Sequence, residues 1–183
     1  MLDTLRHHAT AEDYSSLPEG APCQLIDYEL VMSPAPTSAH QLCLENLRDA
    51  FRDFLKSHGG GRAHFAPFDV HFSDGDVYQP DAFVIRTGNP GKMELNGFHG
   101  APDIVIEVLS PTSVHYDLEH KRTTYERSGV KEYWVVDPMQ WTIECLSNSD
   151  QGFVLTSLVQ KEGIIHSQLL EGFSVEADDI FAR

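Results

Sequence analysis

The stretch that decides the fold is Ala101-Pro-Asp-Ile-Val-Ile-Glu-Val-Leu-Ser-Pro111. Its β-branched residues predict a buried strand over 103–109. Because successive side chains of a strand point to opposite faces, Glu107 shares its face with Val105 and Leu109, while the other face is purely apolar. A carboxylate among apolar neighbours is costly to bury unless a cation compensates its charge. Glu107 therefore predicts a metal ion or a cationic side chain beside it.

A hard cation at Glu107 would need a second carboxylate nearby. Asp103 lies four residues away along the same strand, which is ~13 Å. Gln79–Arg86 is also expected to be a strand, and if it pairs antiparallel with 103–109, Asp81 comes beside Glu107. Asp81 and Glu107 are thus the better metal-binding pair. For Asp103 two interpretations stay open: a carboxylate at the start of the strand, or a residue supporting the site.

A helix is predicted next, over residues 112–128, with a threonine or serine as its N-cap and Gly129 at its end. Lys121 and Tyr125 lie four residues apart and share one face of this helix. By itself, Lys121 is typical of a solvated helix lysine that pairs with Asp117 one turn earlier. The alternative is a lysine that stabilises an anion beside the metal-binding carboxylates of the preceding strand.

The remaining elements alternate between strands and helices. A short capped helix is expected at 10–13, and a longer one at 38–57, with a capping box at Ser38–Gln41. The other expected strands are 24–32, 65–72, 77–86, 131–137, 141–146, 153–159 and 164–170. Residues 73–76 predict a hairpin turn, and the order strand, helix, strand from Asp103 to Asp137 predicts a parallel crossover.

The central pieces of the chain resemble the Uma2 family of the restriction-endonuclease-like PD-(D/E)xK superfamily. They stand in the family's order and spacing: Gln79-Pro-Asp81, Ala101–Pro111, Lys121 with Tyr125, and Ser128-Gly-Val-Lys-Glu-Tyr-Trp-Val-Val-Asp-Pro138. The resemblance covers nearly the whole chain and is most specific at its centre. It implies an α+β (mixed α/β) fold: a restriction-endonuclease-like core with a mixed β-sheet flanked by helices, and additional antiparallel β-hairpins.

The resemblance also implies a site. Asp81 and Glu107 would carry Mg²⁺ or Mn²⁺, and a lysine would assist cleavage of a DNA phosphodiester. In the superfamily that lysine usually lies two residues after the strand acid, where this chain has Leu109. The family resemblance suggests that the lysine function has moved to the helix, at Lys121. Residues expected to support the site are His40, in the first turn of the 38–57 helix, Asp103 and Tyr125. His40 is alternatively a helix-surface residue.

One departure from the family lies near the N-terminus. The family tends to have Tyr-Glu-Leu followed by Gly, whereas this chain has Cys23-Gln24-Leu25, with Tyr28 at the usual glycine. The acid of that motif is therefore replaced by Gln24, which removes any contribution that the acid would make to the site. The set of Asp81, Glu107 and Lys121 is intact.

Composition bounds the remaining possibilities. A length of 183 residues with no linker predicts a single domain over 1–183. No apolar stretch approaches the ~20 residues needed to span a bilayer, so a cytoplasmic location is expected. The three widely spaced cysteines favour neither disulfides nor a zinc site. The Gly-rich phosphate loop and the serine-hydrolase elbow are absent from the sequence.

Charge is the observation that opposes a nuclease. The chain has 13 basic and 28 acidic residues, a net of −15, so a phosphate backbone is repelled overall. The leading hypothesis is a metal-dependent endonuclease acting on DNA, expected as a homodimer because cutting both strands usually needs two sites. The alternative is a non-catalytic interaction or regulatory protein that retains the nuclease fold. Hydrolysis of RNA or a smaller phosphoester also stays open.

Overall fold

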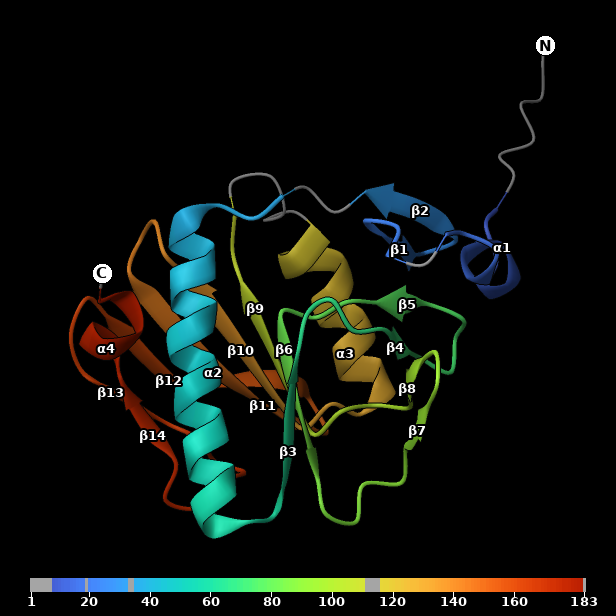
Figure 1. Ribbon diagram of the computed structural model, residues 1–183. Coiled ribbons are helices and arrows are strands. Elements are labelled where there is room, and N and C mark those ends of the chain that lie inside the picture. Colours follow the sequence, from blue (N-terminus) through green and yellow to red (C-terminus); the bar gives the residue numbers. More distant parts are fainter. Residues whose placement is uncertain (1–7, 19, 33–34, 111–115, 183) are drawn as a thin grey trace.

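A main β-sheet runs through the centre of the molecule (Figure 1). The computed structural model describes residues 8–18, 20–32, 35–110 and 116–182, with only the backbone for 116–118. The main sheet has the strand order β12-β11-β10-β9-β6-β3. Its strands are β3 (Gly61–Phe65), β6 (Ala82–Arg86), β9 (Ile104–Val108), β10 (Glu132–Asp137), β11 (Thr142–Ser149) and β12 (Gly152–Gln160). Strand β9 pairs parallel with β10 and antiparallel with β6, which confirms the predicted parallel crossover.

A second mixed sheet lies beside the first, with the order β2-β1-β5-β4-β8-β7. Its strands are β1 (Cys23–Ile26), β2 (Glu29–Met32), β4 (Val70–His71), β5 (Val77–Tyr78), β7 (Lys92–Glu94) and β8 (Gly97–His99). Only β4 and β8 pair in parallel within it. A two-stranded sheet of β13 (Ile164–His166) and β14 (Ser174–Glu176) stands near the C-terminus.

Helices cover both faces of the main sheet (Figure 1). The helices are α1 (Ala11–Ser15), α2 (Ser38–His58), the π-helical η1 (Tyr116–Lys121), α3 (Arg122–Ser128) and α4 (Ala177–Phe181). Helix α2 packs Leu47 and Phe51 on the face that carries Ile104 and Ile106. On the other face, Tyr125 of α3 packs in the cluster that contains Val105. All five residues of β9 are therefore buried, so Glu107 has apolar layers on both sides.

The N-terminal strand prediction was wrong in one respect. The expected strand 24–32 is a hairpin of β1 and β2, which pair antiparallel. The turn between them has φ angles of 48° at Asp27 and 64° at Tyr28. Positive φ at both central residues suits a tight hairpin turn, and glycine usually marks such turns in a sequence. Because neither residue is glycine, the turn carried no local signal.

The strand predicted at 77–86 is divided between two sheets, as β5 and β6, whereas the strand predicted at 65–72 was mostly wrong, since it shares only Phe65 with β3 and only Val70–His71 with β4. Strands β4 and β5 form the predicted hairpin around residues 73–76, in the second sheet. Strands β3 and β6 pair with each other in the main sheet. One apolar run can continue across two sheets, because periodicity reports burial and not the identity of the pairing partner. Residues 87–100, expected only as a connection, form the β7–β8 hairpin.

Helix ends agree in part with the predictions. Thr10 and Asp13 form the capping box of α1. Helix α2 is capped by Thr37, whose side chain accepts a hydrogen bond from the His40 amide, so the capping box placed at Ser38 was wrong. The predicted strand 164–170 stops at His166, and β14 and α4 were missed. The N-cap expected near Thr112 lies outside the described residues.

Candidate active site

The pairing of β6 with β9 brings two predicted site residues together. Ala82 lies opposite Ile106, and continuing this antiparallel register by one residue sets Asp81 opposite Glu107. The backbone amide of Val108 donates a hydrogen bond of 2.8 Å to Oδ2 of Asp81. The carboxylate of Asp81 is thus held against the end of β9, next to the residue that carries the second carboxylate.

Glu107 has its cationic partner in Lys121. The exposed fraction of Glu107 is 1% and that of Lys121 is 4%. Lys121 Nζ donates to both carboxylate oxygens of Glu107, at 3.0 and 3.1 Å, and the Tyr125 hydroxyl donates to Oε1 at 2.6 Å. Burial, followed by the negative charge of Glu107, raises the pKa of Tyr125 well above its ordinary value, so the hydroxyl stays a donor. The solvated-lysine interpretation of Lys121 is wrong.

Lys121 lies at the junction of two helical segments. Lys121 ends the π-helical segment η1 and directly precedes α3, which carries Tyr125. Single π-helical turns occur frequently at functional sites. Lys121 and Tyr125 lie four residues apart and both reach Glu107, as helical neighbours can. Of the side chain of Asp117, its proposed partner, nothing is described.

His40 contacts Asp81 from the first turn of α2. Its Nε2 is 3.1 Å from Oδ2 of Asp81. An ionised carboxylate only accepts hydrogen bonds, so this contact needs the proton on Nε2. The other ring nitrogen, Nδ1, is buried and has no hydrogen-bond partner among the described residues. His40 and the Val108 amide together restrain one oxygen of Asp81, which orients the carboxylate. The helix-surface interpretation of His40 is therefore wrong, since only 7% of it is exposed.

A cavity of about 750 Å³ lies above these groups. It is enclosed by the β1–β2 hairpin, the start of α2, the segment after β3 and the end of β9. Asp81, Glu107, Lys121 and His40 all line it. So does Gln24, the residue that stands in place of the family's acid, and its Oε1 accepts a hydrogen bond of 2.8 Å from the Gln79 amide. This replacement was the one signal in the sequence that the hairpin contributes to the site.

Asp103 lies away from this cavity, at the start of β9. Its carboxylate accepts hydrogen bonds of 2.7 Å from the Arg86 amide, the Asn89 side chain and Lys131 Nζ. Burial by itself would raise the pKa of Asp103, but these donors outweigh it and lower the pKa below its ordinary value of 3.8. Asp103 therefore ties the start of the strand to its neighbours and has no contact with Asp81 or Glu107 among the described interactions.

The donor set fits a small, hard cation. Within the described parts of the chain, no group of three or more His, Cys, Asp or Glu side chains gathers as a metal site. The cavity offers the carboxylates of Asp81 and Glu107. Mg²⁺ commonly binds through one or two carboxylates and keeps several waters, so two are sufficient. Such an ion would bind the Glu107 carboxylate, to which Lys121 also donates hydrogen bonds.

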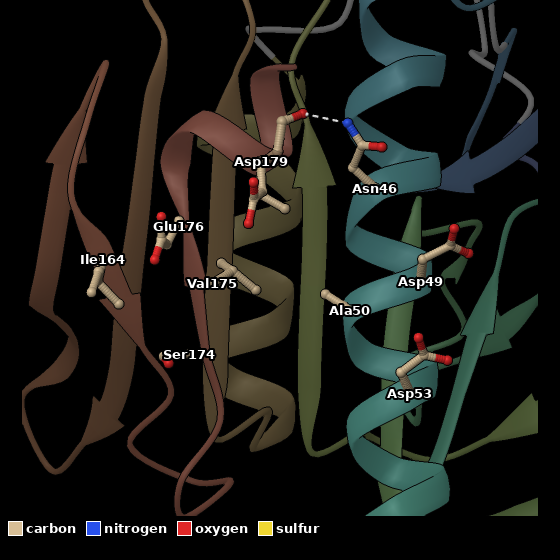
Figure 2. Close-up of a pocket in the computed structure, with 10 residues that line it drawn as sticks. Asn46, Asp49, Ala50, Asp53, Ile164, Ser174, Val175, Glu176 and Asp179 are labelled. Atoms are coloured by element: carbon tan, nitrogen blue, oxygen red, sulfur yellow. Dashed lines mark hydrogen bonds between the residues drawn. The ribbon is translucent and has the colours of Figure 1, made fainter. Parts of the chain in front are cut away.

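A second hollow, of about 460 Å³, lies where α2 meets β14 and α4 (Figure 2). Asn46 of α2 donates a hydrogen bond of 3.1 Å to the Ile180 carbonyl at its edge. The charged residues among its described lining are all acidic: Asp49, Asp53, Glu176 and Asp179. This lining brings no basic side chain to the carboxylates, whereas the cavity at Asp81 and Glu107 combines carboxylates with Lys121 and His40 and is therefore the candidate active site. Along the described helices, none is both long and apolar enough to cross a membrane.

Comparisons with known proteins agree with the fold described above. The sequence model of the Uma2 family, described as "Putative restriction endonuclease", matches residues 11–178. A crystal structure from Anabaena variabilis, described as a "putative nuclease belonging to DUF820", is similar with a TM-score of 0.79 and 20% identity, over 94% of this chain and 97% of that one. At this identity the likeness concerns the fold.

A curated relative matches a shorter stretch. The 3'(2'),5'-bisphosphate nucleotidase CysQ of Haemophilus influenzae is 35% identical over 69 residues, which are 36% of this chain. The matched stretch spans only 23% of that enzyme.

Proposed function

The chain belongs to the Uma2 family, and from this premise we propose that it is a metal-dependent nuclease that hydrolyses DNA phosphodiester bonds. The observation that carries the proposal is the meeting of Asp81, Glu107 and Lys121 at one cavity, although they come from three separate elements. Two carboxylates can hold a metal ion that acts as a Lewis acid, and an ammonium group can offset negative charge on a phosphate.

Each side chain would have a distinct role. Asp81 and Glu107 would hold Mg²⁺ or Mn²⁺, which when bound supplies Lewis acidity and lowers the pKa of a bound water. Lys121, whose ammonium group lies against Glu107, would place its positive charge beside a phosphate oxygen of the substrate. Tyr125 would hold Glu107 in place, and His40 would hold Asp81.

The second candidate is a non-catalytic interaction or regulatory protein that keeps the nuclease fold. The net charge of −15 and the replacement of the family's acid by Gln24 favour it. Against it, an ion pair as deeply buried as Lys121 with Glu107 is expensive to maintain, and such pairs add little net stability. A costly pair at the floor of a cavity is more readily explained by catalysis than by folding.

Cleavage of circular DNA, duplex and single-stranded, tests the proposal. We expect cutting by the wild type with Mg²⁺ or Mn²⁺ and none with EDTA. Asp81→Asn should be inactive, because it removes the charge yet keeps an oxygen that can accept from the Val108 amide. Asp53→Asn, which changes an exposed carboxylate on α2 outside the cavity lining, is the control and should cut normally. Inactivity of the wild type on every substrate would favour the non-catalytic candidate.

Cutting both strands of a duplex would need a second copy of the chain. A closed two-fold homodimer is the commonest arrangement for this. Light scattering would then give twice the chain mass of 20.5 kDa. A monomer would restrict the protein to cutting one strand at a time.

A further inference from the structure

The proposed reacting groups lie deep below the surface. Only 1% of Glu107 and 4% of Lys121 are exposed, and the side chain of Asp81 is 18% exposed. A scissile phosphate must therefore enter the cavity to reach them. A rigid duplex presents its phosphates on the outside of a wide rod, so the whole rod would have to follow the phosphate inward.

The walls of the cavity are mainly apolar. Over half of its described lining residues have no polar side chain, and most of these come from the β1–β2 hairpin and the residues before it, the start of α2 and the residues before it, and the end of β3 with the segment after it. The largest are Ile26, Val31, Met32, Leu44 and Phe65. The volume of about 750 Å³ lies in the range of roughly 300–1,000 Å³ that encloses a small ligand. Such walls suit an unpaired base, whose faces are open, whereas the bases of a duplex are stacked inside.

The net charge of the protein also favours an unpaired strand over a duplex. A duplex carries about one negative charge per ~1.7 Å of its axis, so a protein of net charge −15 would repel it along its whole length. An unpaired strand is flexible and can bring a few phosphates to the cavity alone. Besides Lys121, the described lining has one further cation, Arg48 on α2, which is 45% exposed.

We propose that the substrate of this site is an unpaired nucleic acid strand, with one base against the apolar wall and its phosphate at Asp81, Glu107 and Lys121. This inference rests on the proposed function and narrows its substrate class. The preference arises from the depth of the reacting groups and from the apolar wall. It therefore does not depend on the base sequence of the strand.

Matched substrates test the preference directly. A labelled DNA strand, the same strand annealed to its complement, and a hairpin with an unpaired loop would be incubated with protein and Mn²⁺. We expect cleavage of the free strand and of the loop at least about tenfold faster than cleavage of the duplex. An RNA strand of the same sequence separates the two sources of unpaired phosphodiesters. Duplex cleavage at an equal or higher rate overturns this inference but leaves the proposed function standing, whereas no cleavage of any substrate overturns both.

A pair of methionine variants tests the apolar wall. Met32 lines the cavity and is 67% exposed, while Met93 on β7 is 50% exposed and lies outside the cavity lining. Met32→Ser should raise KM for the free strand about fivefold, because apolar contact with a base is lost. Met93→Ser should leave KM unchanged. Equal KM values for both variants and the wild type would overturn the role of the wall.

Discussion

At the scale of single residues, the ion pair of Lys121 with Glu107 dominates the candidate site. Both side chains are almost wholly buried, and Tyr125 adds a third group to the same carboxylate. Removing one partner of a buried pair leaves the other charge uncompensated, which commonly costs ~3–5 kcal/mol. Stability and the proposed catalysis therefore depend on the same atoms, and a variant must be designed so that the two effects separate.

Glu107→Gln should abolish cleavage and also lower the free energy of unfolding by about 3 kcal/mol, because Lys121 keeps its charge without a partner. The double variant Glu107→Gln with Lys121→Met should recover most of that stability and remain inactive. Urea unfolding and cleavage rates would be measured on both, with Lys121→Met as the third corner of the cycle. Wild-type cleavage by Glu107→Gln would remove this residue from the site.

At the scale of elements, strand β9 is held differently at its two ends. The Val108 amide and Asp81 fasten the end that faces the cavity, while Asp103 fastens the start through three donors. Asp81 directly precedes β6 and Asp103 directly precedes β9, and the side chains of both aspartates are largely shielded from solvent. Only Asp81 is beside Glu107, so the two aspartates should respond differently to a metal ion.

Metal-induced stabilisation distinguishes the two aspartates. Saturating Mn²⁺, at about 100 times Kd, should raise the wild-type Tm by roughly 5–10 °C through mass action. Asp81→Asn should lose this shift, whereas Asp103→Asn should melt at a lower temperature without metal and still keep most of the shift. Differential scanning fluorimetry with Mn²⁺ and with EDTA measures both. The reverse pattern would relocate the metal to the start of β9.

The pH dependence of stability should report on Asp103. Its folded-state pKa lies below the ordinary 3.8, so the ionised form stabilises the fold above about pH 4, and this contribution fades as pH falls through the folded pKa. Asp103→Asn should therefore unfold about 2 kcal/mol more easily at pH 7, through its weakened bonds to charged and amide donors. The gap from the wild type should narrow below pH 4. A gap that is constant down to acid unfolding would contradict this assignment.

At the scale of the whole molecule, the excess of acidic residues opposes the proposed binding of DNA. A net charge of −15 requires local cations at the mouth of the site, because repulsion over a Debye length of ~10 Å is felt at 0.1 M salt. Two arginines on α2 provide a comparison. Arg48 lines the cavity, whereas Arg52, one turn further, lies outside the lining. Both arginines pair with Asp49, at 3.8 Å for Arg48 and 2.9 Å for Arg52.

Arg48→Glu should raise KM for a DNA strand about tenfold at low salt, whereas Arg52→Glu should change KM by less than about twofold. Both variants shift the net charge equally, so the difference isolates the position of the charge. Steady-state kinetics over a series of salt concentrations should show the KM values of the two variants converging, because salt screens the charge at the cavity mouth. An equal rise for both variants would indicate that only overall charge matters.

The sequence by itself determined the centre of the fold and the neighbourhood of the two carboxylates. Alternation along 103–109 separated the apolar face from the face of Glu107, because side-chain direction in a strand depends only on parity. The turn-rich connection after β6 made antiparallel pairing with β9 the simplest arrangement, and the observed register agrees. These features depend on residues that are close together in the chain, so their spacing can be taken directly from the sequence.

Only the tertiary structure decided which groups share the cavity. The contact of His40 with Asp81 joins residues 41 positions apart, and the Lys121 bonds to Glu107 join the end of a π-helical segment to a strand residue 14 positions earlier. The division of 65–86 between two sheets and the hairpin wall beside the site were likewise invisible, since apolar periodicity records burial without naming the partner. Asp103 was left open for the same reason: a buried carboxylate looks alike in sequence whether its donors belong to a site or to a strand end, and only packing supplies the donors.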